Sequence, residues 1–140
     1  MKIEMPSTWQ FKTEIEIRVT DLNYGNHLAN QQFLAFAQEA RMKFFNQFSF
    51  TELDFGGTSL IQADAAITYK GEGHLADIVE ISVSAIKTGN SSFNVFYSFW
   101  NKTKNAPMAD LRTALVCFDY STGKPVGISE KAIGSGIFLS

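Results

Sequence analysis

One segment, residues 31–48, combines helical periodicity with an unusual density of phenylalanine. It contains no glycine or proline, and its apolar side chains recur at spacings of three and four residues. This apolar stripe consists of Phe33, Phe36, Ala37, Ala40, Phe44 and Phe48. A helix with so much aromatic surface is not stable alone in water. The spacing therefore predicts one long helix that a sheet must cover.

The rest of the chain is dominated by alternating apolar and polar residues, which predict strands at 11–20, 59–70, 78–87, 91–100 and 108–120. The tight connection Thr88–Asn90 predicts a hairpin between the third and fourth of these strands. A short helix is expected near Ser129–Ile133. One helix and about five strands predict a single α+β domain over residues 1–140, in which a curved antiparallel sheet wraps around the helix.

A single helix covers about five strands incompletely, so apolar strand surface remains. We therefore expect a homodimer or a higher homo-oligomer such as a tetramer, formed by edge pairing. The thirteen phenylalanines indicate a bulky core, an apolar ligand pocket or a hydrophobic subunit interface.

Composition excludes several classes of function. The net charge of −2 gives no basic surface for nucleic acid. Cys117 is the only cysteine, which excludes an internal disulfide and fits a reducing compartment. No apolar run is long enough for membrane insertion, and the first ten residues lack a signal-peptide core. A cytoplasmic, soluble protein is expected.

A polar turn precedes the predicted helix and contains Asp21, Asn23, Tyr24, His27 and Asn30. Asn30 is a candidate N-cap. The unpaired amides and the dipole of a helix N-terminus favour negative charge, so a site that stabilises an oxyanion could be built here. The alternative is that these residues only form a turn and a cap, and local sequence leaves both interpretations open.

The segment RVTDLNYGNHLANQQFLAFAQEAR resembles the opening segment of hotdog-fold acyl-CoA thioesterases of the 4-hydroxybenzoyl-CoA thioesterase type. The matching residues are Arg18, Asp21, His27, Asn30 and the run Glu39-Ala40-Arg41. The later segment Gly89–Phe99 resembles the Gly-x-Ser-Ser strand of the family. The resemblance implies a hotdog fold and hydrolysis of an acyl thioester to free acid and CoA, without a metal or other cofactor. It also implies a site at the subunit interface of an oligomer.

The chain departs from that family at two positions. The second Asp of the family's Asp-x-Asp motif, typically the catalytic carboxylate, is Asn23 here. An amide cannot act as a base or as a carboxylate nucleophile. The chain instead resembles a subgroup with an Asn-Tyr-Gly-x-His-Leu motif, which usually continues Gly-Asn-Asp. Here the continuation is Ala29-Asn30-Gln31, so a second carboxylate is replaced as well.

Three residues are candidates for catalysis. Histidine exchanges protons near neutral pH, which makes His27 a candidate base. Asp21 is a second candidate base, and Asn23 could hold water or substrate. Glu39 is the remaining carboxylate to consider, but its polar helix face and its spacing of four from Lys43 favour a solvated ion pair. Candidates for substrate binding are Asn30, through its backbone amide, and Tyr24, Ser91 and Ser92.

Two other reactive side chains are expected to have structural roles only. His74 is expected at the surface, and Cys117 in the core. Two scattered histidines and one cysteine give no recognisable zinc pattern, so no metal is expected.

The leading functional hypothesis is an acyl-CoA thioesterase acting on an acyl-CoA or acyl-carrier thioester. The missing carboxylates motivate one alternative, a non-hydrolytic protein that binds acyl-CoA or acyl carrier protein. A second alternative is a hydroxyacyl-thioester dehydratase, in which His27 and Asp21 would have to serve as the catalytic pair.

Overall fold

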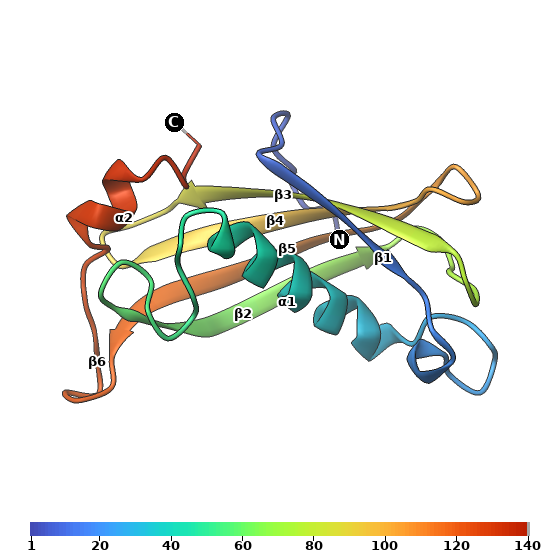
Figure 1. Cartoon of the computed structure of the whole chain (residues 1–140), viewed down its shortest axis with the longest axis horizontal. Coiled ribbons are helices and arrows are strands. Elements are labelled where there is room, and N and C mark those ends of the chain that lie inside the picture. The colour runs from blue at the N-terminus through green and yellow to red at the C-terminus, as the bar shows by residue number, and fades with distance from the viewer. Residues whose placement is uncertain (140) are drawn as a thin grey trace.

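The structure, a computed structural model that describes residues 1–139, consists of one antiparallel sheet with a long helix across one face (Figure 1). The strands are β1 (Phe11–Glu16), β2 (Ser59–Tyr69), β3 (Ile78–Lys87), β4 (Ser92–Asn101), β5 (Ala106–Asp119) and β6 (Lys124–Pro125). The helices are α1 (Asn30–Asn46) and α2 (Glu130–Gly134), and a 3-10 turn covers Val19–Asp21. The strand order is β1-β3-β4-β5-β2, and β6 pairs with β5. The predicted α+β architecture is confirmed.

The apolar stripe of α1 packs onto the inner face of the sheet. Its members within α1, Phe33, Phe36, Ala37, Ala40 and Phe44, are all buried, and Phe45 beside the stripe is buried as well, whereas Phe48 lies beyond the helix and is half-buried. Phe33 lies 5.5 Å from Phe99 of β4 between ring centroids, and Phe45 lies 5.1 Å from Phe55. Burying one such ring contributes about 1.5–3 kcal/mol. Much of the phenylalanine content is therefore used in the core.

The middle of α1 is also fixed by a buried charge. Arg41 is only 4% exposed and donates to Glu52 Oε1 at 2.9 Å and to the hydroxyl of Tyr97 at 3.0 Å. Tyr97 Oη in turn lies 2.7 Å from Thr113 Oγ1. Because a buried charge is stable only with such partners, this network fixes the register of α1 against β4 and β5.

The strand β6 was not predicted, several element ends are shifted by one or two residues, and three further differences affect the region around α1 and β2. The first strand ends at Glu16 rather than at residue 20, because Val19–Asp21 turns into a 3-10 helix. α1 begins at Asn30 with Ala29 as the N-cap, so the prediction of Asn30 as N-cap was wrong by one residue. A bulge between Gln62 and Asp64 switches the inward face of β2.

β2 forms one edge of the sheet and is poorly covered. Gln62, Ala63, Asp64 and Ala65 in its middle are exposed, whereas the matching parts of β3 and β4 are largely buried. Within the described residues, no helix is long and apolar enough to cross a membrane.

Candidate active site

The polar turn before α1 is organised by the side chain of Asn23. Its Oδ1 accepts hydrogen bonds from the backbone N–H of Gly25 at 2.9 Å and of His27 at 3.2 Å. The backbone N–H of Asn23 donates to the carbonyl of His27 at 2.9 Å, which closes the loop. Asn26 takes the left-handed conformation with φ 64°, which asparagine tolerates better than most residues. Asn23 thus holds the backbone that carries His27.

Asp21 is fully buried beside this turn, and its carboxylate is already occupied. It accepts hydrogen bonds from the backbone N–H of Arg18 at 2.8 Å, from the Arg18 guanidinium, and from Gln32 Nε2 at 2.8 Å. Burial alone would raise the pKa of Asp21, but these hydrogen bonds outweigh it and hold the pKa below its usual value. A carboxylate of lowered proton affinity is a poor base. Its visible role is to tie the 3-10 turn to the first turn of α1.

The N-terminus of α1 presents free amide groups. Ala29 has no side-chain oxygen to cap the helix, and its own N–H donates to the carbonyl of Asp21 at 3.0 Å. No described residue accepts a hydrogen bond from the N–H of Asn30 or of Gln31. Such amides and the helix dipole attract a negatively charged oxygen.

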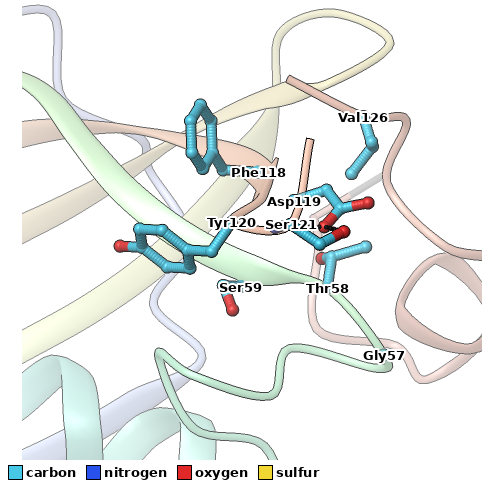
Figure 2. Close-up of a pocket in the computed structure, with 8 residues that line it drawn as sticks. All are labelled: Gly57, Thr58, Ser59, Phe118, Asp119, Tyr120, Ser121 and Val126. Carbon is cyan, nitrogen blue, oxygen red and sulfur yellow. Dashed lines mark hydrogen bonds between the residues drawn. The ribbon is translucent and has the colours of Figure 1, made fainter. Parts of the chain in front are cut away.

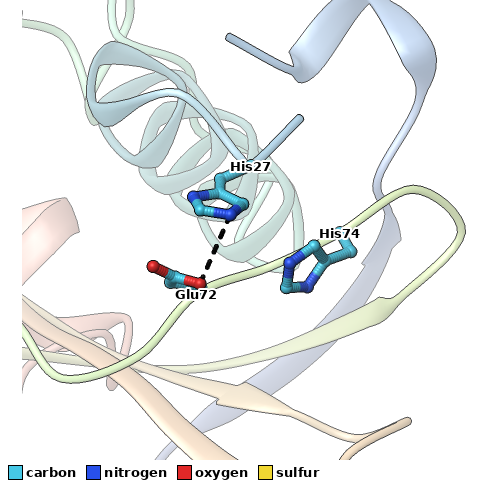
Figure 3. Close-up of side chains that lie close together, drawn as sticks. All are labelled: His27, Glu72 and His74. Atoms are coloured by element: carbon cyan, nitrogen blue, oxygen red, sulfur yellow. Dashed lines mark ion pairs between the residues drawn. The ribbon is translucent and has the colours of Figure 1, made fainter. Parts of the chain in front are cut away.

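Next to this terminus, His27 meets two residues from a distant segment, Glu72 and His74 (Figure 3). His27 Nε2 lies 3.5 Å from Glu72 Oε2. The rings of His27 and His74 are perpendicular, with an interplanar angle of 82° and centroids 4.9 Å apart. We call these three residues the His–Glu cluster. All three side chains are accessible to solvent, with 40% exposure for His27, 61% for Glu72 and 45% for His74.

The backbone explains why these side chains meet. The N–H of Leu28 donates to the carbonyl of Gly73 at 2.8 Å, which joins the two loops beside the cluster. A Cβ on Gly73 would lie 2.5 Å from Ile17 Cδ1 and 2.8 Å from Met108 Cε, so this position faces the core. Glu72 and His74, on either side of it in extended chain, therefore face outward toward His27.

Sequence reasoning missed Glu72 and assigned His74 only to the surface. The spacing Glu-Gly-His in extended chain is the one local signal, since it places two ligating side chains on one side. The contact with His27 depends on pairing between segments far apart in sequence, which no local pattern contains.

Ser91 and Ser92 lie far from this turn within one chain. They follow the end of β3 at Lys87, whereas the segment that carries His74 precedes its start at Ile78. That length of strand is roughly 30 Å. Ser92 Oγ accepts from Thr88 Oγ1 at 3.0 Å, as in a hairpin turn. Tyr24, at the tip of the polar turn, is fully exposed.

A hollow of about 430 Å³ also lies at the far end of the sheet, where β2 begins and β5 ends (Figure 2). Its lining residues are Gly57, Thr58, Ser59, Phe118, Asp119, Tyr120, Ser121 and Val126. None of the candidate catalytic residues lines it, so it is separate from the His27 turn within one chain.

The fold is shared with solved thioesterase structures. A 1,4-dihydroxy-2-naphthoyl-CoA thioesterase from Synechocystis matches with a TM-score of 0.82 and 16% identity over 89% of this chain and 93% of that chain. The probable thioesterase YbaW from Escherichia coli matches with a TM-score of 0.77 and 19% identity over 90% and 96%. A DHNA-CoA thioesterase from Staphylococcus aureus matches with a TM-score of 0.74 and 20% identity over 83% of this chain and 78% of that chain.

No curated protein matches the chain. At identities this low, the structural similarity concerns the fold, and it confirms the hotdog fold that the Arg18–Arg41 segment implied. The family is established separately by sequence, because the family model of the thioesterase-like superfamily matches residues 17–133. The match contains the polar turn, the long helix and every strand after β1, and the protein belongs to the thioesterase-like superfamily.

Proposed function

We propose that the protein hydrolyses an acyl thioester of coenzyme A or of an acyl carrier protein, releasing the free acid and the thiol. One observation carries this proposal. His27, in contact with the carboxylate of Glu72, stands just before a helix N-terminus at which two amides have no acceptor among residues 1–139. A base and an oxyanion site are the two parts that thioester hydrolysis requires.

The amides of Asn30 and Gln31 are assigned to the carbonyl oxygen of the thioester. Negative charge develops on that oxygen when water attacks the carbonyl carbon, and preorganised N–H donors stabilise it. Removing one such donor in other enzymes slows the reaction by about 100–1,000-fold. The N-terminus of the long helix α1 adds its dipole in the same sense.

His27 is assigned to the water. Its imidazole takes a proton as the water oxygen bonds to the carbonyl carbon, and the imidazolium returns that proton to the sulfur when the C–S bond breaks. Glu72 orients the ring and stabilises the imidazolium, as a carboxylate does for histidine in hydrolytic triads. This scheme uses no metal.

The two other candidates act through His27. Asn23 fixes the backbone of His27 with its Oδ1 and keeps its NH₂ group free to hold the water or the substrate. Asp21 anchors the turn to α1 through Gln32. Both are positioning residues in this proposal.

A homodimer would complete the site. β2 is an uncovered edge strand, and two such edges related by a two-fold axis pair antiparallel. The Tyr69 end of one β2 then lies beside the Ser59 end of the other. Because Tyr69 Oη donates to the carbonyl of Asn30 at 3.4 Å, the first end is also the end of the His27 turn. The hollow near Ser59, and the hairpin of Ser91 and Ser92 at that end of the sheet, would thus approach the partner's turn.

The test is release of free thiol from a panel of short, long and aromatic acyl-CoAs. The panel includes 1,4-dihydroxy-2-naphthoyl-CoA, because two of the similar structures are thioesterases for that compound. We expect His27→Ala to lose about 100- to 10,000-fold in rate, the range for a positioned base. Glu72→Gln should lose roughly tenfold or more, because the amide cannot stabilise an imidazolium by charge.

Glu39→Gln is the matched control for Glu72→Gln. Glu39 is also an exposed glutamate in an ion pair, 2.8 Å from Lys43, but it lies on the outer face of α1. The Glu39→Gln variant should release thiol at the wild-type rate. A wild-type rate that survives His27→Ala would contradict the assignment of the base.

The replaced carboxylates support a second candidate function, a protein that binds acyl-CoA or acyl carrier protein without turnover. Asn23 and Gln31 stand where the family has carboxylates, and neither amide can act as a base. Tight binding of acyl-CoA with no thiol release from any panel member would favour it. The dehydratase alternative requires a His27–Asp21 pair, and the contacts of Asp21 with Arg18 and Gln32 give that pair no support.

A further inference from the structure

The His–Glu cluster contains both histidines of the chain. Each of its three residues offers one ligand atom, and these atoms all lie within 4.8 Å of one another. Two neutral imidazoles and one carboxylate form a donor set that binds zinc in proteins and leaves a fourth position for water. We propose that His27, Glu72 and His74 bind a divalent transition-metal ion of the Zn²⁺ type.

The separations fit such an ion. Bonds of about 2.1 Å to a tetrahedral metal place neighbouring ligand atoms about 3.4 Å apart. The observed distance between His27 Nε2 and Glu72 Oε2 is 3.5 Å. The wider separations within the cluster close by side-chain rotation, because all three side chains extend into solvent.

The backbone beneath the cluster is fixed, so little order has to be created on binding. The Leu28–Gly73 hydrogen bond joins the two loops, and Asn23 Oδ1 holds the N–H of His27. On the other loop, the backbone N–H of His74 donates to Asp77 Oδ2 at 3.1 Å. Both ligand-bearing loops are therefore anchored by hydrogen bonds next to the ligands.

Ligand chemistry selects the kind of ion. Imidazole favours Zn²⁺, Co²⁺, Ni²⁺ and Cu²⁺, whereas Mg²⁺ and Ca²⁺ need more oxygen ligands than one carboxylate supplies. Cys117 does not compete as a soft ligand, because burial raises the pKa of its thiol and the side chain is inaccessible.

The test is a direct titration of the tag-free, metal-stripped, full-length protein. Zn²⁺ binding is followed by calorimetry, and Co²⁺ binding by the visible absorption of a tetrahedral Co²⁺ site. We expect one ion per chain, and affinity at least about tenfold lower in Glu72→Gln and in His74→Ala. Mg²⁺ and Ca²⁺ should give no binding. Glu39→Gln, an equally conservative change at an exposed glutamate, should bind Zn²⁺ like the wild type.

Two results would overturn the inference. One is the absence of saturable Zn²⁺ and Co²⁺ binding by the wild-type protein. The other is binding with the same affinity in Glu72→Gln and His74→Ala, which would place the ion elsewhere. Glu72→Gln is isosteric and exposed, so it tests the site without disturbing the fold. The binding measurement uses no thioester. Absence of hydrolysis would therefore not contradict the metal site, and absence of metal binding would not contradict the proposed hydrolysis.

Discussion

Asn23 is the residue at which the structure makes its most discriminating prediction. Its Oδ1 accepts two backbone hydrogen bonds, from Gly25 and from His27. Asn23→Ala removes this acceptor, whereas Asn23→Asp retains it and exchanges only the NH₂ group for an oxygen. Comparing the two variants therefore separates the acceptor role of Asn23 from its donor role.

The magnitude follows from those two hydrogen bonds. Each net hydrogen bond contributes about 0.5–1.5 kcal/mol, and the exposed position of Asn23 favours the low end. Asn23→Ala should lower the free energy of unfolding by about 1–2 kcal/mol. Since unfolding entropy is about 2.1 cal/mol/K per residue, this lowers the Tm of a chain of this length by roughly 3–7 °C. Asn23→Asp should be at least as stable as the wild type, because N–H donors bind a charged acceptor more strongly.

Urea unfolding measures the first effect, and thiol release measures the functional one. Asn23→Ala should also hydrolyse more slowly, because the backbone of His27 loses its support. Asn23→Asp keeps the turn and should therefore hydrolyse faster than Asn23→Ala, and any loss relative to the wild type measures the contribution of the NH₂ group. If Asn23→Asp were destabilised as much as Asn23→Ala, the acceptor role assigned to Asn23 would be refuted.

Four further predictions concern pH, metal, the core and the edge strand. The folded-state pKa of Asp21 lies below that of the unfolded chain, so its stabilisation is complete above the unfolded value and is lost as the pH falls through the folded value. In urea unfolding, the free energy of unfolding of Asp21→Asn should therefore depend less on pH than that of the wild type below about pH 4. The same pH dependence in both proteins would contradict this. Zn²⁺ should slow thiol release, because a metal-bound imidazole cannot accept a proton. Half-inhibition of His74→Ala should require at least about tenfold more Zn²⁺ than half-inhibition of the wild type. Equal Zn²⁺ sensitivity of the two proteins would place the inhibitory ion elsewhere. Tyr97→Phe should lower the free energy of unfolding by about 1–3 kcal/mol in urea, because the buried Arg41 loses its 3.0 Å acceptor and the buried Thr113 hydroxyl loses its 2.7 Å partner. A loss below about 1 kcal/mol would show that the network is dispensable. Ala65→Lys should turn a homodimer into a monomer by light scattering, because a two-fold axis brings the like charges together at the β2 edge; a persistent dimer would exclude that edge.

The main elements of the fold were predictable because they depend on local periodicity. The three- and four-residue spacing of Phe33, Phe36, Ala40 and Phe44 predicted α1, and all four are buried. β2 shows where periodicity fails. Strict alternation puts Ile61 and Ile67 on one face, but the bulge between Gln62 and Asp64 breaks the alternation, so that Leu60 before it and Ile67 after it both pack against the core. A single extra residue in one strand hardly changes the alternating sequence pattern, but it moves the following side chains to the opposite face of the sheet.

Only the part of the candidate site that lies in one continuous segment was predictable from the sequence. The turn residues from Asp21 to Asn30 and their place before the helix follow from neighbouring sequence. Glu72 and His74 join His27 only because the Leu28 amide pairs with the Gly73 carbonyl and because Gly73 must face the core. Those two constraints are long-range contacts, which neither composition nor spacing encodes.

The contacts of Asn23 also bear on why this chain can lack the carboxylate that the resemblance implies at position 23. A carboxylate at this position would accept the N–H groups of Gly25 and His27, and hydrogen bonds of that kind lower its pKa and its strength as a base. Asparagine makes the same two contacts without a charge, so the turn is preserved. The carboxylate of Glu72 then lies near His27 with no second negative charge from position 23 beside it. In the arrangement proposed here, the carboxylate therefore supports a base instead of being one, and it comes from the segment that Gly73 joins to the turn.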